Sequence, residues 1–342
     1  MNTQQTTQPA PKALEVNNLQ QRFYLTKGFF QSLRREDGRI CWNDKVVHAL
    51  NGISFDVQEG EVYALVGESG CGKSTAAKTV IRLLEPAAGQ ILYKGQDISH
   101  LPEQKLGKVR REMQMIFQDP YTSLNPRQRV IDIICEPLLF HKLASNRAEA
   151  EEKAVDLLQK VGLRPEHSRR YPHQFSGGQR QRIVIARSLA VEPDFIIADE
   201  PVSALDVSIQ AQILNLLMDL KDEMGFSCLF IAHDLSVVRH ISDRLACMYL
   251  GSITEKGHKN QIFENPLHPY TKMLFSAVPT IDEEPIVEEM TIKGEIPSAV
   301  NLPSGCYFHD RCPYAMPICR QEFPEEREME PGHFVACHLY DA

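Results

Sequence analysis

A glycine-rich segment of eight residues constrains the fold of this chain more than any other feature. Residues Gly67 to Ser74 read G-E-S-G-C-G-K-S, which matches the pattern G-x4-G-K-S/T of a phosphate-binding loop. The run 61–66 before the loop, apolar from Val62 onward, predicts a strand, and the pattern of 75–84 after it predicts a helix. A chance glycine turn is the alternative, and these flanks argue against it. Strand, glycine loop and helix in this order predict a parallel α/β nucleus.

The residue types in this loop suit a nucleotide and a magnesium ion. The loop amides and the N-terminus of the following helix would point at the phosphates. Lys73 would neutralise charge on the β- and γ-phosphates, and the Ser74 hydroxyl would ligate magnesium. Because Cys71 lies at the positive end of a helix, we expect a more reactive thiol there than at Cys228. The predicted nucleotide-binding residues of the loop are Ser69, Gly70, Cys71, Gly72, Lys73, Ser74 and Thr75.

Two adjacent carboxylates follow a second apolar run. Residues 195–198 are apolar and predict a strand, and Asp199 and Glu200 stand at its end, where an α/β sheet presents its ligands. A helix N-cap pair is the structural alternative, but the phosphate loop upstream favours catalysis. We therefore expect Asp199 to hold hydrated magnesium. Glu200 is expected to orient or deprotonate the attacking water, an effect worth about 10²–10⁴ in rate.

A third motif separates the classes of nucleotide-binding protein. Residues 175–179 read F-S-G-G-Q and precede the two carboxylates in the chain. A Gly-Gly turn before a helix would alone be ordinary capping. Together with the other motifs, it makes the chain resemble the ABC ATPase family, whose signature loop commonly reads L-S-G-G-Q. The resemblance extends, in chain order, to Gln118 after the run 113–117, Asp206 in S-A-L-D, and His233 after the run 228–232.

The resemblance implies a role for each of these residues. It implies that Gln118 senses magnesium and the lytic water, and that His233 contacts the γ-phosphate of ATP. It further implies that the signature loop binds ATP held by the phosphate loop of a partner, with Asp206 coupling across the dimer. An aromatic side chain stacks on adenine in this family, and Phe23 is the best-placed candidate, with Tyr24 and Trp42 as alternatives. The signature residues are Ser176, Gly177, Gly178 and Gln179.

Three further segments narrow the resemblance. The run 117–127, the segment N-P-L-H-P-Y-T at 265–271 and a cysteine-rich tail are similar to ATP-binding subunits of dipeptide or oligopeptide importers, above all the dipeptide-permease F-type subunit. The resemblance implies a paralogous ATPase partner in a heterodimer, two integral-membrane permease subunits and, indirectly, an external substrate-binding protein. The alternatives are importers for nickel, glutathione, heme or antimicrobial peptides, and a soluble ABC ATPase of repair or translation.

Charge and hydropathy bear on these alternatives. The chain has 37 Lys and Arg against 45 Asp and Glu, a net charge of −8. This negative charge argues against a protein whose main role is to bind the phosphate backbone of a nucleic acid. We therefore expect no nucleic-acid partner. No run approaches the ~20 apolar residues of a membrane-spanning helix, and the N-terminus lacks the apolar core of a secretory signal. We expect a peripheral protein at the cytoplasmic face of the inner (plasma) membrane.

Four of the nine cysteines crowd the C-terminal region with the spacing C-x5-C-x6-C-x17-C. Disulfides are not expected in a reducing compartment. Four thiolates on a small Pro-rich segment suit either a tetrahedral zinc ion or a 4Fe-4S cluster. Similar importer ATPases carry an iron-sulfur cluster at this pattern, so the cluster is favoured, with Zn²⁺ as the runner-up and free thiols third. The cysteines are Cys306, Cys312, Cys319 and Cys337.

The expected fold class is α/β, an ABC-type P-loop nucleotide-binding domain. It would carry an antiparallel β subdomain, a helical insertion and a small Cys-rich C-terminal tail. We expect a long exposed loop over 27–44, and pairing of 245–251 with 252–255. The predicted boundaries are a disordered N-terminus over 1–12, an ABC ATPase domain over 13–280 with its helical insertion at about 126–190, and the tail over 281–342.

Overall fold

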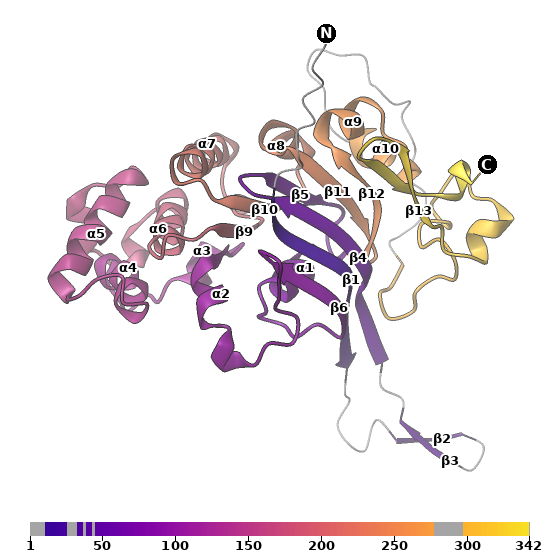
Figure 1. Ribbon diagram of the computed structural model, residues 1–342, viewed down its shortest axis with the longest axis horizontal. Coiled ribbons are helices and arrows are strands. Elements are labelled where there is room, and N and C mark those ends of the chain that lie inside the picture. Colours follow the sequence, from indigo (N-terminus) through magenta and orange to yellow (C-terminus); the bar gives the residue numbers. More distant parts are fainter. Residues whose placement is uncertain (1–10, 26–32, 37–38, 43–44, 277–296, 342) are drawn as a thin grey trace, which may run out of the picture. The chain divides into compact units, whose positions relative to one another are not determined.

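The structure is a computed structural model that describes residues 11–25, 33–36, 39–42, 45–276 and 297–341. Figure 1 shows the chain in ribbon form, coloured along the sequence. The chain divides into two compact units. Unit 1 comprises residues 1–15, 56–63 and 92–231, and unit 2 comprises residues 16–55, 64–91 and 232–342. Among the described residues, no helix combines the length and the apolar character needed to span a membrane.

Parallel strands form the centre of unit 1. Strand β9 (Phe195–Asp199) pairs in parallel with β8 (Met113–Ile116) and with β10 (Ser227–Ala232). Every residue of β9 and β10 is buried, and a parallel strand covered on both faces requires such a continuous apolar run. Because parallel strands end at one edge of the sheet, Asp199 lies at the edge where ligands of α/β proteins bind.

Helices make up most of the predicted insertion in unit 1. In Figure 1, α4, α5 and α6 lie together, and each of these helices contacts the other two. Two hydrogen bonds fix the start of α5: the N-cap side chain Asn146 Oδ1 accepts from the Glu149 amide at 3.0 Å, and Glu149 Oε2 accepts from the amide of the preceding Ser145 at 2.8 Å. The helices of unit 1 are α2 (Gly107–Glu112), α3 (Pro120–Ser123), α4 (Val130–Phe140), α5 (Arg147–Lys160), α6 (Gly177–Leu189) and α7 (Val207–Met224).

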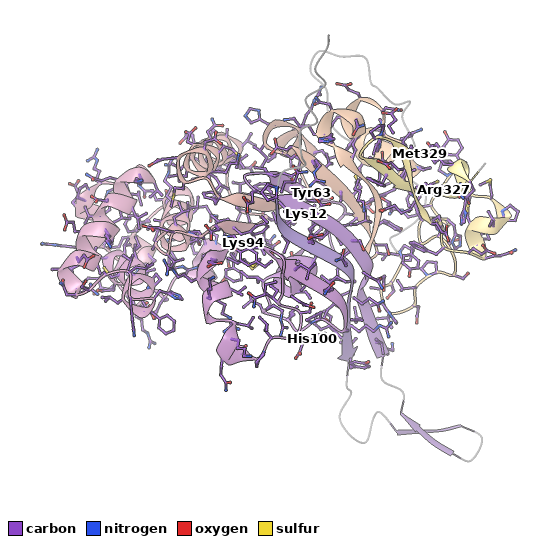
Figure 2. All side chains as sticks on the ribbon, viewed as in Figure 1. Lys12, Tyr63, Lys94, His100, Arg327 and Met329 are labelled. Atoms are coloured by element: carbon purple, nitrogen blue, oxygen red, sulfur yellow. The ribbon has the colours of Figure 1, made fainter. Side chains whose placement is uncertain are left out.

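Five neighbouring strands of one sheet, which lie wholly or mostly in unit 2, join the ATPase region to the C-terminal tail. Their order is β13 (Glu326–Glu330), β14 (His333–Ala336), β12 (Ser252–His258), β11 (Arg244–Tyr249), β5 (Val62–Val66). The antiparallel pairing of β11 with β12 confirms the predicted hairpin. Strand β13 is exposed along its whole length, and Figure 2 labels Arg327 and Met329 on it. Its charged sequence, E-R-E-M-E, suits an outer strand that must not pair with other chains.

Four further strands form a separate sheet, in the order β4 (Lys45–Gln58), β1 (Lys12–Leu25), β6 (Ala88–Tyr93), β7 (Gln96–Asp97). The β6–β7 pairing of this sheet, made by the part of β6 in unit 1, is antiparallel, and the assignment of the whole sheet as the antiparallel β subdomain stays a prediction. The N-terminal segment predicted to be disordered lies outside the described residues up to residue 10, and Lys12 begins β1. The helices of unit 2 are α1 (Lys73–Val80), α8 (Leu235–Ile241), α9 (Lys259–Glu264) and α10 (Pro269–Ser276).

The prediction of a long loop over 27–44 was wrong. Strand β2 (Leu33–Glu36) pairs with β3 (Arg39–Trp42) in an antiparallel hairpin, with Leu33 opposite Trp42 and Glu36 opposite Arg39. The sequence carries a signal for this hairpin, because an Asp-Gly pair separates the two strands and favours a two-residue turn. The many charges around that pair hid the signal.

Candidate functional site

The phosphate loop lies in unit 2, between β5 and α1. Lys73 is buried, and its Nζ donates to the carbonyl oxygens of Gly67 at 2.7 Å and Glu68 at 3.1 Å. The Cys71 carbonyl accepts from the Gly251 amide at 2.8 Å, which ties the loop to the turn between β11 and β12. The loop is therefore wrapped around an ammonium group, and it offers an anion both a positive charge and backbone amides.

The close approach of Gly67 to β11 allows a direct test of the loop geometry. The φ of Gly67 is +151°, and a Cβ added there would lie 2.2 Å from the Met248 carbonyl oxygen. We expect Gly67→Ala to displace the loop and weaken nucleotide binding by about tenfold or more, since tenfold corresponds to about 1.4 kcal/mol. Gly60→Ala is the matched control, because Gly60 also has a positive φ but an added Cβ meets nothing within 4 Å. Titration with a fluorescent ATP analogue checks this, and equal affinities of the two variants would contradict the account.

The Cys71 thiol does not have the low pKa that a helix N-terminus would give it. It is buried, and burial raises its pKa above the ordinary value despite the lowering effect of Lys73. Burial also raises the pKa of Cys228 to about 12. The expected order of reactivity of the two thiols stays a prediction.

Three of the residues predicted to act on water and magnesium, Gln118, Asp199 and Glu200, lie in unit 1, whereas Ser74 lies in unit 2 with the phosphate loop. Asp199 is the last residue of β9 and is buried, and Glu200 follows it with a left-handed φ of 46°. The Glu200 amide donates to the Ile231 carbonyl at 3.0 Å, which fixes this unusual conformation at the end of β10. Gln118 Nε2 donates to Glu200 Oε2 at 2.9 Å, across 82 residues of sequence. The structure therefore brings Gln118 to the predicted catalytic carboxylate.

The signature loop begins α6 of unit 1. Ser176 is the N-cap, and its hydroxyl accepts from the Gln179 amide at 3.4 Å while Gln179 Oε1 accepts from the Ser176 amide at 3.2 Å. Gly178 lies against α7, where an added Cβ would come within 2.5 Å of Ile209 Cγ2. Asp206, the N-cap residue of α7, is exposed, as is Ser176. Ser176 and Gln179 of the S-G-G-Q sequence thus form the capping box that starts α6. Because Ser176 is exposed, its side chain is accessible to a partner protein.

The two other predicted ATP contacts lie in unit 2. His233 is exposed and directly follows β10. Phe23 is half-buried near the end of β1, and Tyr24 beside it is 64% exposed. The side chain of Trp42 lies outside the described residues. The assignment of Phe23 to adenine stays a prediction.

Two residues of the C-terminal half contact the phosphate loop and were missed by the sequence analysis. Tyr270 Oη accepts from the Glu68 amide at 2.9 Å. The Arg311 guanidinium donates to both carboxylate oxygens of Glu68, at 2.7 and 2.9 Å. The hydrogen bonds to Glu68 raise the pKa of Arg311, and burial lowers it. The hydrogen bonds have the larger effect, so the pKa lies above its ordinary value. Glu68 occupies a variable position of the loop motif, so no pattern in the sequence pointed to a partner 243 residues away.

The four tail cysteines converge without forming a metal site in the structure. They are free, and Cys306 interacts electrostatically with the other three, which shows that they share one region. Burial raises the pKa of Cys306 to about 12 and that of Cys337 to about 11. Within the described part of the chain, however, no group of three or more His, Cys, Asp or Glu side chains is arranged to hold a metal ion. The four thiols are donors that suit a thiophilic metal, but the structure does not arrange them around a common metal position.

Comparison with known proteins identifies two family regions. Residues 50–203 match the family "ABC transporter", and residues 254–319 match "Oligopeptide/dipeptide transporter, C-terminal region". The second region contains Tyr270 and Arg311, which contact the phosphate loop within unit 2.

Individual relatives agree with this assignment. The chain is 54% identical over 330 residues to the "Oligopeptide transport ATP-binding protein AppF" of Bacillus subtilis (strain 168), covering 96% of this chain and 97% of the relative. It is 50% identical to the "Di/tripeptide transport ATP-binding protein DppF" of Pseudomonas aeruginosa (strain UCBPP-PA14), over 85% and 90% of the two chains. The solved structure of the dimeric ATP-binding cassette MJ0796 with ADP and Pi matches with a TM-score of 0.62 and 27% identity, over 72% of this chain and 98% of that chain. The chain therefore belongs to the ABC transporter family of ATPases, among the ATP-binding subunits that carry the oligopeptide/dipeptide transporter C-terminal region.

Proposed function

We propose that this chain is the ATP-hydrolysing subunit that powers the uptake of dipeptides or oligopeptides through an ABC importer. One observation carries the proposal: a single chain joins the ABC transporter region at 50–203 to the oligopeptide/dipeptide transporter C-terminal region at 254–319, and an oligopeptide-transport relative matches 96% of it. The relatives it matches are named for peptide transport. The alternatives of nickel, glutathione, heme or antimicrobial-peptide transport, and of repair or translation, are not favoured by these matches.

Binding of ATP would use the phosphate loop and a signature loop from a second ATPase. The amides of 69–75 would cradle the phosphates, and the Lys73 ammonium would exchange its two loop carbonyls for phosphate oxygens. Ser176 and Gly178 would contact the γ-phosphate held by the partner, and Asp206 would couple the two chains. Ser74, Gln118 and Asp199 offer the hard oxygen donors that Mg²⁺ prefers, and the ion would neutralise phosphate charge when bound.

Hydrolysis would depend on the Gln118–Glu200 pair. The Gln118 amide holds the Glu200 carboxylate by a hydrogen bond of 2.9 Å, which limits its rotation. Glu200 would accept a proton from water as the water oxygen bonds to the γ-phosphorus, and the bond from that phosphorus to the β,γ-bridging oxygen would break to release ADP. His233 would contact the γ-phosphate and help to orient it.

The proposed assembly is a heterodimer with a paralogous ATPase, docked from the cytoplasmic face on two membrane permease subunits that receive peptide from an external binding protein. Closure on two ATP molecules and opening after hydrolysis would move the permease. Uptake of a labelled oligopeptide by a deletion strain tests the proposal. We expect uptake to be lost on deletion and restored by the wild-type gene, and unchanged uptake after deletion would overturn the peptide assignment.

We propose separately that the four tail thiols bind a metal centre, with a 4Fe-4S cluster preferred and Zn²⁺ as the runner-up. The support is the thiolate chemistry and the chain spacing of Cys306, Cys312, Cys319 and Cys337, which lie in one region of the tail although the described residues form no metal site as they stand. Anaerobic purification of the full chain, with assays of iron, acid-labile sulfide and zinc, tests it. About four iron and four sulfide per chain would support the cluster. Zinc without iron would select the runner-up, and the absence of both would leave the tail with free thiols and end the proposal.

A further inference from the structure

The C-terminal tail contacts the phosphate loop through one ion pair. Glu68, the second residue of the loop, lies opposite Arg311 of the tail, with Nη1 to Oε2 at 2.7 Å and Nη2 to Oε1 at 2.9 Å. The Arg311 side chain is 4% exposed and that of Glu68 is 22% exposed. Two parallel charge-assisted hydrogen bonds in a largely buried setting are both directional and strong. This pair differs from the exposed ion pairs of the surface, whose contribution is small.

Aromatic side chains hold Arg311 in place. Its guanidinium carbon lies 5.7 Å from the Tyr249 ring centre and 5.8 Å from that of Phe308, within the range of a cation–π contact. Tyr249, Tyr270 and Phe308 pack on one another, with ring centres 4.8 to 5.5 Å apart. Tyr270 also accepts the amide hydrogen of Glu68. This aromatic cluster therefore fixes both the Arg311 side chain and the backbone of the loop at Glu68.

The charge of Glu68 gives the ion pair a consequence for binding. Glu68 belongs to the loop that receives the phosphates of ATP, and its carbonyl oxygen accepts from Lys73, the phosphate-contacting lysine. A carboxylate at this position without a cation would repel the incoming phosphates and compete for Lys73. A buried charge that loses its partner is also costly in itself. The bidentate contact with Arg311 neutralises the Glu68 carboxylate, and it thereby removes the repulsion of the phosphates, the competition for Lys73 and the cost of an unpaired buried charge.

We propose that Arg311 is a positioning residue for ATP binding, which neutralises Glu68 and fixes the phosphate loop to the C-terminal tail. Arg311 touches no nucleotide in this proposal and acts through Glu68. Through this residue, the C-terminal tail contributes to the affinity of the site for ATP. The inference rests on the proposed role of the phosphate loop in ATP binding.

A double-mutant cycle on the full chain tests the inference, with the affinity for Mg-ATP as the readout. We expect Arg311→Met to raise the dissociation constant by about tenfold, which corresponds to about 1.4 kcal/mol. Adding Glu68→Gln to Arg311→Met should bring the dissociation constant back toward the wild-type value, because the unpaired carboxylate is then gone. Arg311→Lys keeps the positive charge but cannot make two parallel hydrogen bonds to the carboxylate. Its affinity for Mg-ATP should lie between those of the wild type and Arg311→Met. If Arg311 acted only by tying the loop to the tail, the double variant would show no rescue of ATP affinity, because it lacks that contact as well.

Controls separate the possible failures. Arg320→Met removes an exposed ion pair of the same tail, Arg320 Nη1 to Asp310 Oδ1 at 3.0 Å, and should leave ATP binding unchanged. Wild-type affinity of Arg311→Met, or no rescue in the double variant, would overturn the inference. If Arg311→Met fails to fold, the comparison of Arg311→Lys with and without Glu68→Gln decides in the same way. Wild-type ATP affinity of Lys73→Met would instead overturn the proposed function of the loop.

Discussion

Replacing Glu200 with glutamine should lower the rate of ATP hydrolysis by about 10²–10⁴, the usual contribution of a general base. Glutamine keeps the size of the side chain but cannot accept a proton from water. The Gln118–Glu200 hydrogen bond of 2.9 Å places this carboxylate at the end of β9, beside Asp199. Because Glu200 is not part of the phosphate loop, we expect the affinity for ATP to be retained. Phosphate release by the assembled complex and titration with an ATP analogue measure the two quantities.

Glu192→Gln is the matched control for this prediction. Glu192 is an exposed carboxylate of the same unit, shortly before β9, and its replacement should leave the hydrolysis rate unchanged. A Glu200→Gln complex that turns over ATP at nearly the wild-type rate, measured with the proposed paralogous ATPase inactivated, would remove Glu200 from the mechanism.

Lys73→Met should lower the hydrolysis rate by about 10²–10³, the typical cost of one preorganised charge-stabilising donor, and should weaken ATP binding as well. Methionine retains the apolar stem in a buried position but removes the ammonium. In the structure that ammonium donates to two loop carbonyls, so it lies inside the loop that would surround the phosphates. The loss in binding separates this variant from Glu200→Gln, in which only the chemical step should slow.

Lys78→Met serves as the control, because Lys78 lies in the last turn of the same helix α1. Its replacement should change neither binding nor hydrolysis. Thermal unfolding of all variants shows whether they remain folded. Equal ATP affinities for Lys73→Met and Lys78→Met would mean that the phosphate loop does not bind the triphosphate in the proposed way.

Much of the fold could be predicted because the relevant segments carry strong local patterns. Strand β9 is a continuous apolar run, and α7 has apolar positions at helical spacing and a glycine just beyond its end. The β11–β12 hairpin could be predicted because two short strand-like runs, 245–251 and 252–255, follow each other directly in the sequence. These elements depend on interactions between residues that are close in sequence or on burial of a whole segment.

The elements that were missed depend on context. The β2–β3 hairpin was obscured by charges around its turn, and β13 is exposed at every position, so neither shows the hydrophobic alternation of a half-buried strand. The ion pair between Glu68 and Arg311 joins residues 243 positions apart. A single sequence contains no signal for such a pair, because each partner alone looks like an ordinary surface charge.

Transport into proteoliposomes that contain the complete importer tests the central claim most directly. The measured quantity is the rate at which a labelled oligopeptide, delivered by the binding protein, enters the vesicles when ATP is present on the side of the ATPases. The account predicts ATP-dependent uptake with the wild-type chain and strongly reduced uptake with Glu200→Gln. Uptake at the wild-type rate with Glu200→Gln, or without ATP, would contradict it.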